Sequence, residues 1–292
     1  MSVAPAPPIS LRSAAAPLPV YVPVRLPRWA VPALVAASPL LIVAMGPLFW
    51  QADPLAQNLI GRLAGMTPQH PLGTDELGRD MLARILRGGQ LSLGVSAAVT
   101  AVTAVIGVAL GSIAAQRCGG LLDALLMRLI DILLAFPFLL VALAVAGLAG
   151  GGVGGIFIAL VLFGWVTHAL VSRAETVRVS SGLFVEAARA CGATPLRVYT
   201  RHVLPNALPP LIVISVVRFS QTLLAIAGLS FLGVGVQPPT PEWGALLSEG
   251  MPFVERAPLL LLVPGVAVTL SCLVLTLGSE ALRRALKPPV VC

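Results

Sequence analysis

Few side chains in this chain could carry out chemistry, and their spacing keeps them apart. His70, His168 and His202 fall in three separate segments, and the four cysteines show no Cys-x-x-Cys spacing, so we expect no dedicated metal site. Ser230 and His168 could serve an intramembrane hydrolase as nucleophile and base. Ser230 is expected near the outer end of one apolar run and His168 near the inner end of another, however. Side chains at these opposite depths cannot make a contact of about 3 Å.

A nucleotide site is also absent from the sequence. Lys287 is the only lysine, and it stands in Leu-Lys-Pro-Pro, which excludes a phosphate-binding GxxxxGK[ST] loop. We therefore predict no catalytic residue, no metal ligand and no cofactor bound by this chain. Any energy from ATP must come from another polypeptide.

The composition of the chain indicates the class of protein in which these residues lie. Of 292 residues, 57% are apolar and only 11% are charged, against about 25% charged residues in soluble domains. The mean hydropathy is +0.95. The net charge of +7 comes from basic residues dispersed near the ends of apolar runs, not from one stripe, so we expect no nucleic-acid partner. The chain is predicted to be an all-α integral membrane protein.

Six stretches are long enough to cross a bilayer, which needs roughly 20 mainly apolar residues. A tight hairpin is expected at Gly150–Gly152, between the third and fourth of them. The predicted spans are about 29–50, 91–115, 129–149, 153–172, 208–236 and 258–278.

The distribution of positive charge predicts the orientation of these spans. Thirteen of the 19 Arg and Lys residues fall in segments that share a side with the N-terminus, which places both termini in the cytoplasm. We expect an N-terminal tail over 1–28, a transmembrane domain over 29–287 and a C-terminal tail over 288–292. The longest cytoplasmic segment is the loop 173–206.

This loop predicts two short helices joined at a glycine. Gly192 fits a helix end that needs a positive φ, and Thr194 followed by Pro195 is a helix-start signal. The second helix is expected to reach about Val203 and to stop before Pro205. The apolar face of the first helix has no evident core to fill. The two helices are expected to form a compact knob, which either docks into a groove of a soluble partner or lies on the bilayer surface.

The same loop resembles a known signature. Glu186-Ala187-Ala188, Gly192 and His202-Val203-Leu204-Pro205-Asn206 are similar to the EAA motif of permease subunits of bacterial ATP-binding-cassette importers. In that family the loop docks into a cleft of the ATPase subunit. The resemblance implies that Glu186 offers a polar contact, that the alanines allow close approach and that Gly192 makes the turn. The implied ATPase-coupling residues are Glu186, Ala187, Ala188, Gly192, His202, Leu204 and Pro205.

Further blocks resemble the dipeptide, oligopeptide and nickel branch of these permeases. They are the segments 70–80, 131–137, 229–233, 237–239 and 243–244. Two positions depart from the pattern. Ile226 stands where many peptide members have a glutamate, which favours nickel or a metal chelate as the cargo. Ser279 stands where Asp usually follows Gly278.

The resemblance implies a type I ABC importer permease fold with six transmembrane helices in the inner membrane. The expected partners are a second related permease, two ATPase subunits that carry ATP and Mg²⁺, an external solute-binding protein, the small solute and membrane lipid. The cargo would be short peptides or nickel. A stand-alone channel or secondary carrier is the alternative function, although we find no internal repeat.

Three polar groups have two interpretations each. Arg218 and Gln221 lie within the fifth predicted span, where they either line the solute path or make a structural contact. Arg128 and Asp131 are three residues apart and could pair on one helix face, as part of a gate or as a solvated ion pair. The outer-loop residues either shape the mouth and receive the binding protein or serve as caps and ion pairs. They are Asp75, Arg79 and Asp80.

Overall fold

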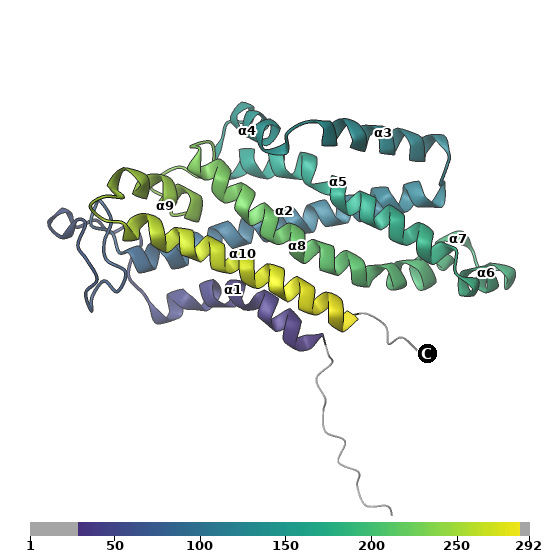
Figure 1. Cartoon of the computed structure of the whole chain (residues 1–292), viewed down its shortest axis with the longest axis horizontal. Coiled ribbons are helices and arrows are strands. Elements are labelled where there is room, and N and C mark those ends of the chain that lie inside the picture. Colours follow the sequence, from purple (N-terminus) through teal and green to yellow (C-terminus); the bar gives the residue numbers. More distant parts are fainter. Residues whose placement is uncertain (1–28, 287–292) are drawn as a thin grey trace, which may run out of the picture.

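The computed structural model describes residues 29–286, so the tails expected at 1–28 and 288–292, and Lys287, lie outside it. The described part is a bundle of long helices with loops and short helices at both ends (Figure 1). The long helices are α1 (Ala30–Phe49), α2 (Met81–Gln116), α3 (Leu121–Ala135), α4 (Phe138–Leu148), α5 (Gly152–Ser180), α8 (Leu204–Phe231) and α10 (Leu259–Leu286). The short elements are η1 (Leu59–Gly61), α6 (Leu183–Ala190), α7 (Pro195–Val198), η2 (Tyr199–Val203), α9 (Trp243–Gly250) and η3 (Met251–Phe253).

Five of these helices are long and apolar enough to cross a membrane by themselves: α1, α2, α5, α8 and α10. A sixth crossing requires α3 and α4 together, which are bent by 91° relative to one another. Six crossings are therefore reached only if this bent pair is counted as one span.

The third predicted span, 129–149, is not one straight helix but is sharply bent at Pro137. The chain breaks between α3 and α4, where Phe136 is extended with φ −93° and ψ 142°. Proline has no amide hydrogen, and its ring disfavours helical geometry in the preceding residue, so Pro137 ends α3 and starts α4. The hairpin after α4 is confirmed, since Gly150, Gly151 and Gly152 all have positive φ.

The fifth predicted span, 208–236, has different ends in the structure. Helix α8 starts earlier, at Leu204, and ends at Phe231. Gly233 has φ +82°, and the amide of Val234 donates to the carbonyl of Leu229 at 3.2 Å, which closes the helix as a Schellman motif. The residues directly after 231 form a turn, although they are apolar like the residues of the preceding helix.

Helices α2 and α5 make the most extensive contact in the bundle. Gly107 and Gly111 of α2 lie against Trp165 and Ala169 of α5, so closely that a Cβ at either glycine would overlap the α5 backbone. Small residues four apart are the usual means of bringing membrane helices together. This pair forms the centre onto which the other helices pack.

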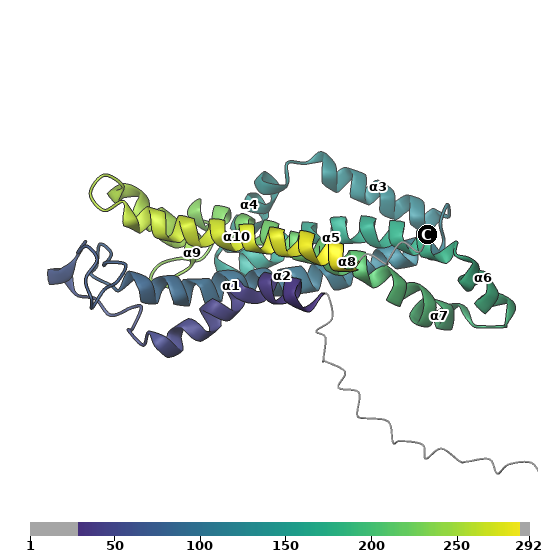
Figure 2. The ribbon, with the colours of Figure 1, turned by 60° about the horizontal axis from the view of Figure 1, so that its bottom comes forward.

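The remaining helices cover this centre unevenly. Helix α10 packs against both α1 and α8, and α4 packs on α5. Figures 1 and 2 show α3 running along the outside of the bundle, where Ile130 packs against Trp165 and Val166 of α5. The described part thus has a knob formed by α6, α7 and η2 at one end and the loop 51–80 at the other (Figure 1).

Candidate coupling surface and solute groove

The knob, residues 183–203, has a small apolar core. Val185 and Val198 are buried against Val179 of α5 and Leu211 of α8. The apolar face expected of the first helix lies largely outside this core, because Leu183, Phe184, Ala187 and Cys191 are exposed and only Ala188 is half-buried. Val185 of α6 packs inward, so the knob is held in a defined position relative to the long helices.

Other apolar side chains of the knob point outward. Leu183 is 82% exposed and Leu196 is 72% exposed. Glu186 and Ala187 are exposed beside them, and Ala188 is half-buried. The outer surface therefore combines small and apolar groups with one carboxylate and three exposed arginines, Arg189, Arg197 and Arg201, which suits contact with another protein.

The turn between the two short helices follows the sequence prediction. Gly192 has φ +82°, and the hydroxyl of Thr194 accepts a hydrogen bond from the amide of Arg197 at 3.4 Å with Pro195 at the first helical position. Gly192 has open space around it, so its conformation is required by backbone geometry and not by crowding.

The predicted stop before Pro205 is wrong. After α7 the chain makes the π-helical turn η2 and continues directly into α8, with Pro205 in the first turn of that helix. The amide of Leu204 donates to the carbonyl of Tyr199, five residues back, which changes the hydrogen-bond register just before the proline that cannot donate. His202 and Leu204 are half-buried in this segment, and Pro205 is exposed.

Arg218 and Gln221 line a groove of about 660 Å³. The Arg218 Nη1 donates to Gln221 Oε1 at 2.8 Å. Phe138 of α4 and Val268 of α10 flank the groove on either side of α8. The structure thus places both residues on an open face of α8, beside a concave and mostly apolar surface.

The pair expected between Arg128 and Asp131 is wrong. Both side chains are exposed on α3, and no ion pair joins them within residues 29–286. The acid that matters on α3 is Asp123, which the sequence analysis missed. Its carboxylate accepts from Arg173 Nε at 2.6 Å and from Nη2 at 2.7 Å, and so ties α3 to α5. The signal was an acid three residues after Gly119-Gly120, near the start of an apolar helix.

We expect this bidentate pair to fasten the start of α3 to α5, in addition to the apolar contact that Ile130 makes further along the helix. Asp123→Asn should lower the stability of the chain by about 2 kcal/mol, because the half-buried Arg173 would lose a charged partner. The measurement is the thermal unfolding midpoint in detergent of Asp123→Asn, Arg173→Gln and the double variant. Strictly additive effects of the two single substitutions would contradict a direct pairing.

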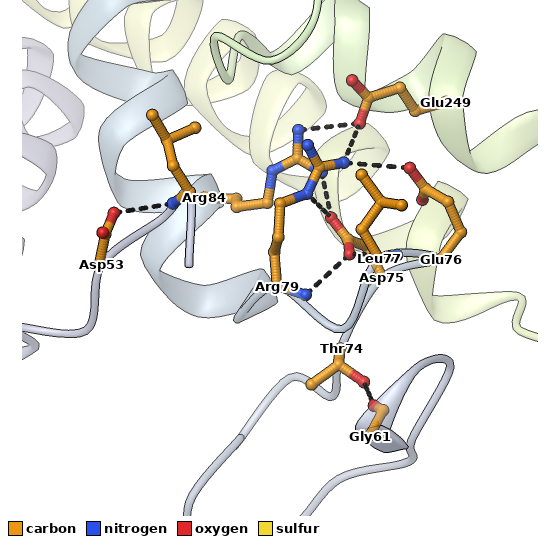
Figure 3. Close-up of polar contacts among 10 residues, drawn as sticks. Asp53, Gly61, Thr74, Asp75, Glu76, Leu77, Arg79, Arg84 and Glu249 are labelled. Carbon is orange, nitrogen blue, oxygen red and sulfur yellow. Dashed lines mark hydrogen bonds and ion pairs between the residues drawn. The ribbon is translucent and has the colours of Figure 1, made fainter. Parts of the chain in front are cut away.

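At the opposite end of the bundle, a charged network connects the loop 51–80 to α2 and α9. Figure 3 shows Arg79 and Arg84 converging on Asp75 and Glu249. Arg79 Nε donates to Asp75 Oδ2 at 2.6 Å, and Arg84 Nη2 lies 2.8 Å from Glu249 Oε2. Arg84 Nη1 also donates to Asp75. The network fastens residues that are far apart in sequence.

Glu76 completes this network at its edge. Its Oε1 accepts from Arg79 Nη2 at 3.0 Å, and burial raises the pKa of its carboxyl above the usual value of 4.5. The carboxylates of Asp75, Glu76 and Glu249 lie within 4.8 Å of one another, a spacing that could hold a metal ion. Two guanidinium groups already contact these carboxylates, so the arrangement fits a structural ion network and not a cation site.

Asp80 has a separate role. Its Oδ1 accepts from the amide of Ala83 at 2.7 Å and caps α2, and Trp50 Nε1 donates to the same oxygen at 2.9 Å. His70 Nδ1 lies 2.8 Å from the other oxygen. Of the three outer-loop residues singled out from the sequence, Asp75 and Arg79 lie together in the ion network, and Asp80 lies in a cap. Arg84 and Glu249 were missed because nothing in their local sequence relates them.

Comparison with known proteins assigns the chain to a family. A family model described as "binding-protein-dependent transport system inner membrane component" matches residues 107–290. The di/tripeptide transport system permease protein DppC of Pseudomonas aeruginosa is 39% identical over 229 residues, which covers 77% of this chain and 74% of that protein. The glutathione transport system permease protein GsiD of Escherichia coli is 38% identical with the same coverage of both chains.

Two further matches agree with this. A putative peptide transport system permease protein of Brucella suis is 36% identical over 248 residues, covering 85% of this chain and 83% of that protein. A solved chain of the inward-facing MetNI methionine ABC transporter has a TM-score of 0.58 at 20% identity, covering 71% of this chain and 98% of that one, and so shares its fold. The chain therefore belongs to the family of binding-protein-dependent transport system inner membrane components and is the permease subunit of an ABC importer, a transport component and not an enzyme.

Proposed function

We propose that this permease forms half of the solute path of an ATP-driven importer of short peptides and that the knob couples it to an ATPase subunit. The observation that carries the proposal is the outward-facing surface around Leu183 and Leu196 at the end of the bundle opposite the loop 51–80. The knob is anchored to α5 and α8 by an apolar core and has an exposed apolar surface, which suits docking into a protein groove better than lying as a flexible segment on lipid.

The continuity of α7, η2 and α8 supports a mechanical link. Helical backbone runs without interruption from Pro195 to Phe231, so a displacement of the knob is passed to the part of α8 that lines the groove. Closure of ATPase subunits on ATP and Mg²⁺ would move the knob and thereby favour one of two arrangements of the spans. On this proposal the knob and both termini are cytoplasmic, and the loop 51–80 faces an external solute-binding protein. A second related permease completes the path.

Short peptides are the cargo that the relatives' names favour, and the structure weakens the hint towards nickel. Ile226 is 1% exposed in the apolar core formed by α2, α4, α5 and α8. It does not line the groove that contains Arg218. The departure at this position is therefore a matter of core packing.

The coupling test uses two glycines with the same geometry. Gly192 in the knob and Gly233 after α8 both have φ +82° and open space around them, so a leucine at either site introduces similar backbone strain. We expect Gly192→Leu to lower peptide-stimulated ATP hydrolysis by the reconstituted importer about tenfold, which corresponds to about 1.4 kcal/mol. Gly233→Leu should change it less than twofold.

Both variants are first checked for co-purification with the partner subunits. Equal coupling in the two variants would contradict the lever role of the knob. Solute flux through liposomes that contain this chain alone, without nucleotide, would instead favour the channel or secondary carrier.

A further inference from the structure

Arg218 is half-buried and forms no ion pair with an acidic side chain among the described residues. All twelve Asp and Glu residues of the chain fall within 29–286, so every side-chain carboxylate is placed by the structure. None of them lies within ion-pair distance of Arg218, whereas Arg79, Arg84 and Arg173 each have such a partner. The charge of Arg218 must therefore be balanced by something other than an acid of this chain.

The position of Arg218 makes this need acute. It is the fifteenth residue of the 28-residue helix α8, so it lies roughly 20 Å from either end of the helix at about 1.5 Å per residue. That is the middle of a bilayer span, where an arginine must face protein or water and not lipid. The groove beside α8 supplies such a surface.

The chemistry of the groove indicates what binds there. Gln221 Oε1 accepts one hydrogen bond from Arg218 and leaves the other guanidinium N–H groups without a hydrogen-bond partner among the described residues. Phe138, Leu139 and Leu247 provide apolar walls, and the volume of about 660 Å³ is that of a small-molecule site. No carboxylate lines the groove, so a bare divalent cation would meet only the positive charge of Arg218.

We propose that Arg218 binds a carboxylate of the transported solute, and that the groove thereby selects peptides with a free C-terminal carboxylate over neutral analogues and bare metal cations. This inference rests on the proposed function as a peptide importer. A guanidinium held by Gln221 presents its donors as a planar fork, which matches the two oxygens of a carboxylate. The apolar walls then accommodate peptide side chains of varied shape.

The test measures ATP-dependent uptake into proteoliposomes that contain the complete importer with its binding protein. The probe is an equimolar mixture of apolar di- and tripeptides, each supplied as the C-terminal acid and as the C-terminal amide. Because the binding protein is the same in every sample, its own preference cancels when variants are compared. Arg218→Gln should lower uptake of the acids about tenfold and of the amides less than twofold. Arg218→Lys, which keeps the charge, should retain acid uptake within about threefold of the unaltered protein.

Arg87 provides a matched control. Its Nη1 donates to Gln90 Oε1 at 2.8 Å with the same three-residue spacing, but it lies at the start of α2 and outside this groove. Arg87→Gln should leave the ratio of acid to amide uptake unchanged.

Three results would overturn the inference: equal loss of acid and amide uptake in Arg218→Gln, undiminished acid uptake, or loss of the second permease from the purified complex, which would show a structural contact. A complex that hydrolyses ATP but takes up no peptide of either kind would contradict the proposed peptide cargo itself.

Discussion

Arg84→Ala is expected to lower the stability of this permease by about 3–5 kcal/mol, because it removes one partner of a buried ion network. Arg84 is 1% exposed and lies between Asp75 of the loop 51–80 and Glu249 of α9. Without it, the buried carboxylate of Asp75 and the half-buried carboxylate of Glu249 would keep only Arg79 as a cationic partner among residues 29–286. For a domain of this size the change corresponds to a fall of about 10 °C in the thermal unfolding midpoint.

The same helix offers a control for Arg84. Arg87 lies one turn further along α2, is exposed and has no ion pair within the residues that the structure describes. Arg87→Ala should shift the unfolding midpoint by less than 2 °C, since exposed substitutions usually change stability by less than about 0.5 kcal/mol. Arg84→Lys should recover only part of the loss, because an ammonium cannot contact both carboxylates through a planar fork. Equal midpoints for Arg84→Ala and Arg87→Ala would refute the structural role of the network.

Gly111→Leu is expected to disrupt the packing of α2 on α5. A Cβ at Gly111 would overlap the carbonyl of Ala169 and crowd the amide of Arg173, and neither backbone group can move without displacing α5. Overpacking of a well-packed core usually costs about 1–3 kcal/mol. Here rigid backbone is displaced at the most extensive helix contact, so we expect about 3 kcal/mol or more, seen as loss of monodisperse protein in size-exclusion chromatography.

Gly94 provides the opposite case on the same helix. It is exposed, and a Cβ there would meet nothing within 4 Å. Gly94→Leu should be neutral or stabilising by up to about 1 kcal/mol, because leucine is a better helix former than glycine. The two substitutions are chemically identical, so their difference isolates the contact with α5. Similar yields and unfolding midpoints for both would show that the close approach of α2 and α5 is not required.

Much of the secondary structure could be predicted because it depends on neighbouring residues. Long apolar runs locate the spans, since a helix satisfies its backbone hydrogen bonds internally within lipid. The turn at Gly192 and the cap at Thr194 were also readable, because a positive φ and a hydroxyl cap are local requirements. Family membership followed from the same loop, whose motif is contiguous in sequence.

The proline-containing segments were harder to predict. Pro39 and Pro264 lie inside continuous helices, and Pro205 lies in the first turn of α8, after a π-helical turn. Pro137, in contrast, separates α3 from α4, whose axes are bent by 91° relative to one another. The residue type is the same in every case. Whether the helix continues depends on packing and on how the freed carbonyl groups are satisfied, which local sequence does not contain.

The sequence by itself determined that this chain is a multi-span membrane permease with a helical knob, because hydropathy, caps and a contiguous motif are local properties. Only the tertiary structure decided which charges meet. It paired Asp123 with Arg173, whereas Arg128 and Asp131 form no pair within residues 29–286. It also joined Arg84 of α2 to Glu249 of α9, which are far apart in the sequence. It also left Arg218 facing a groove without a carboxylate. Such pairings depend on the packing of distant helices, and a Coulomb interaction depends on distance in space and not on separation along the chain.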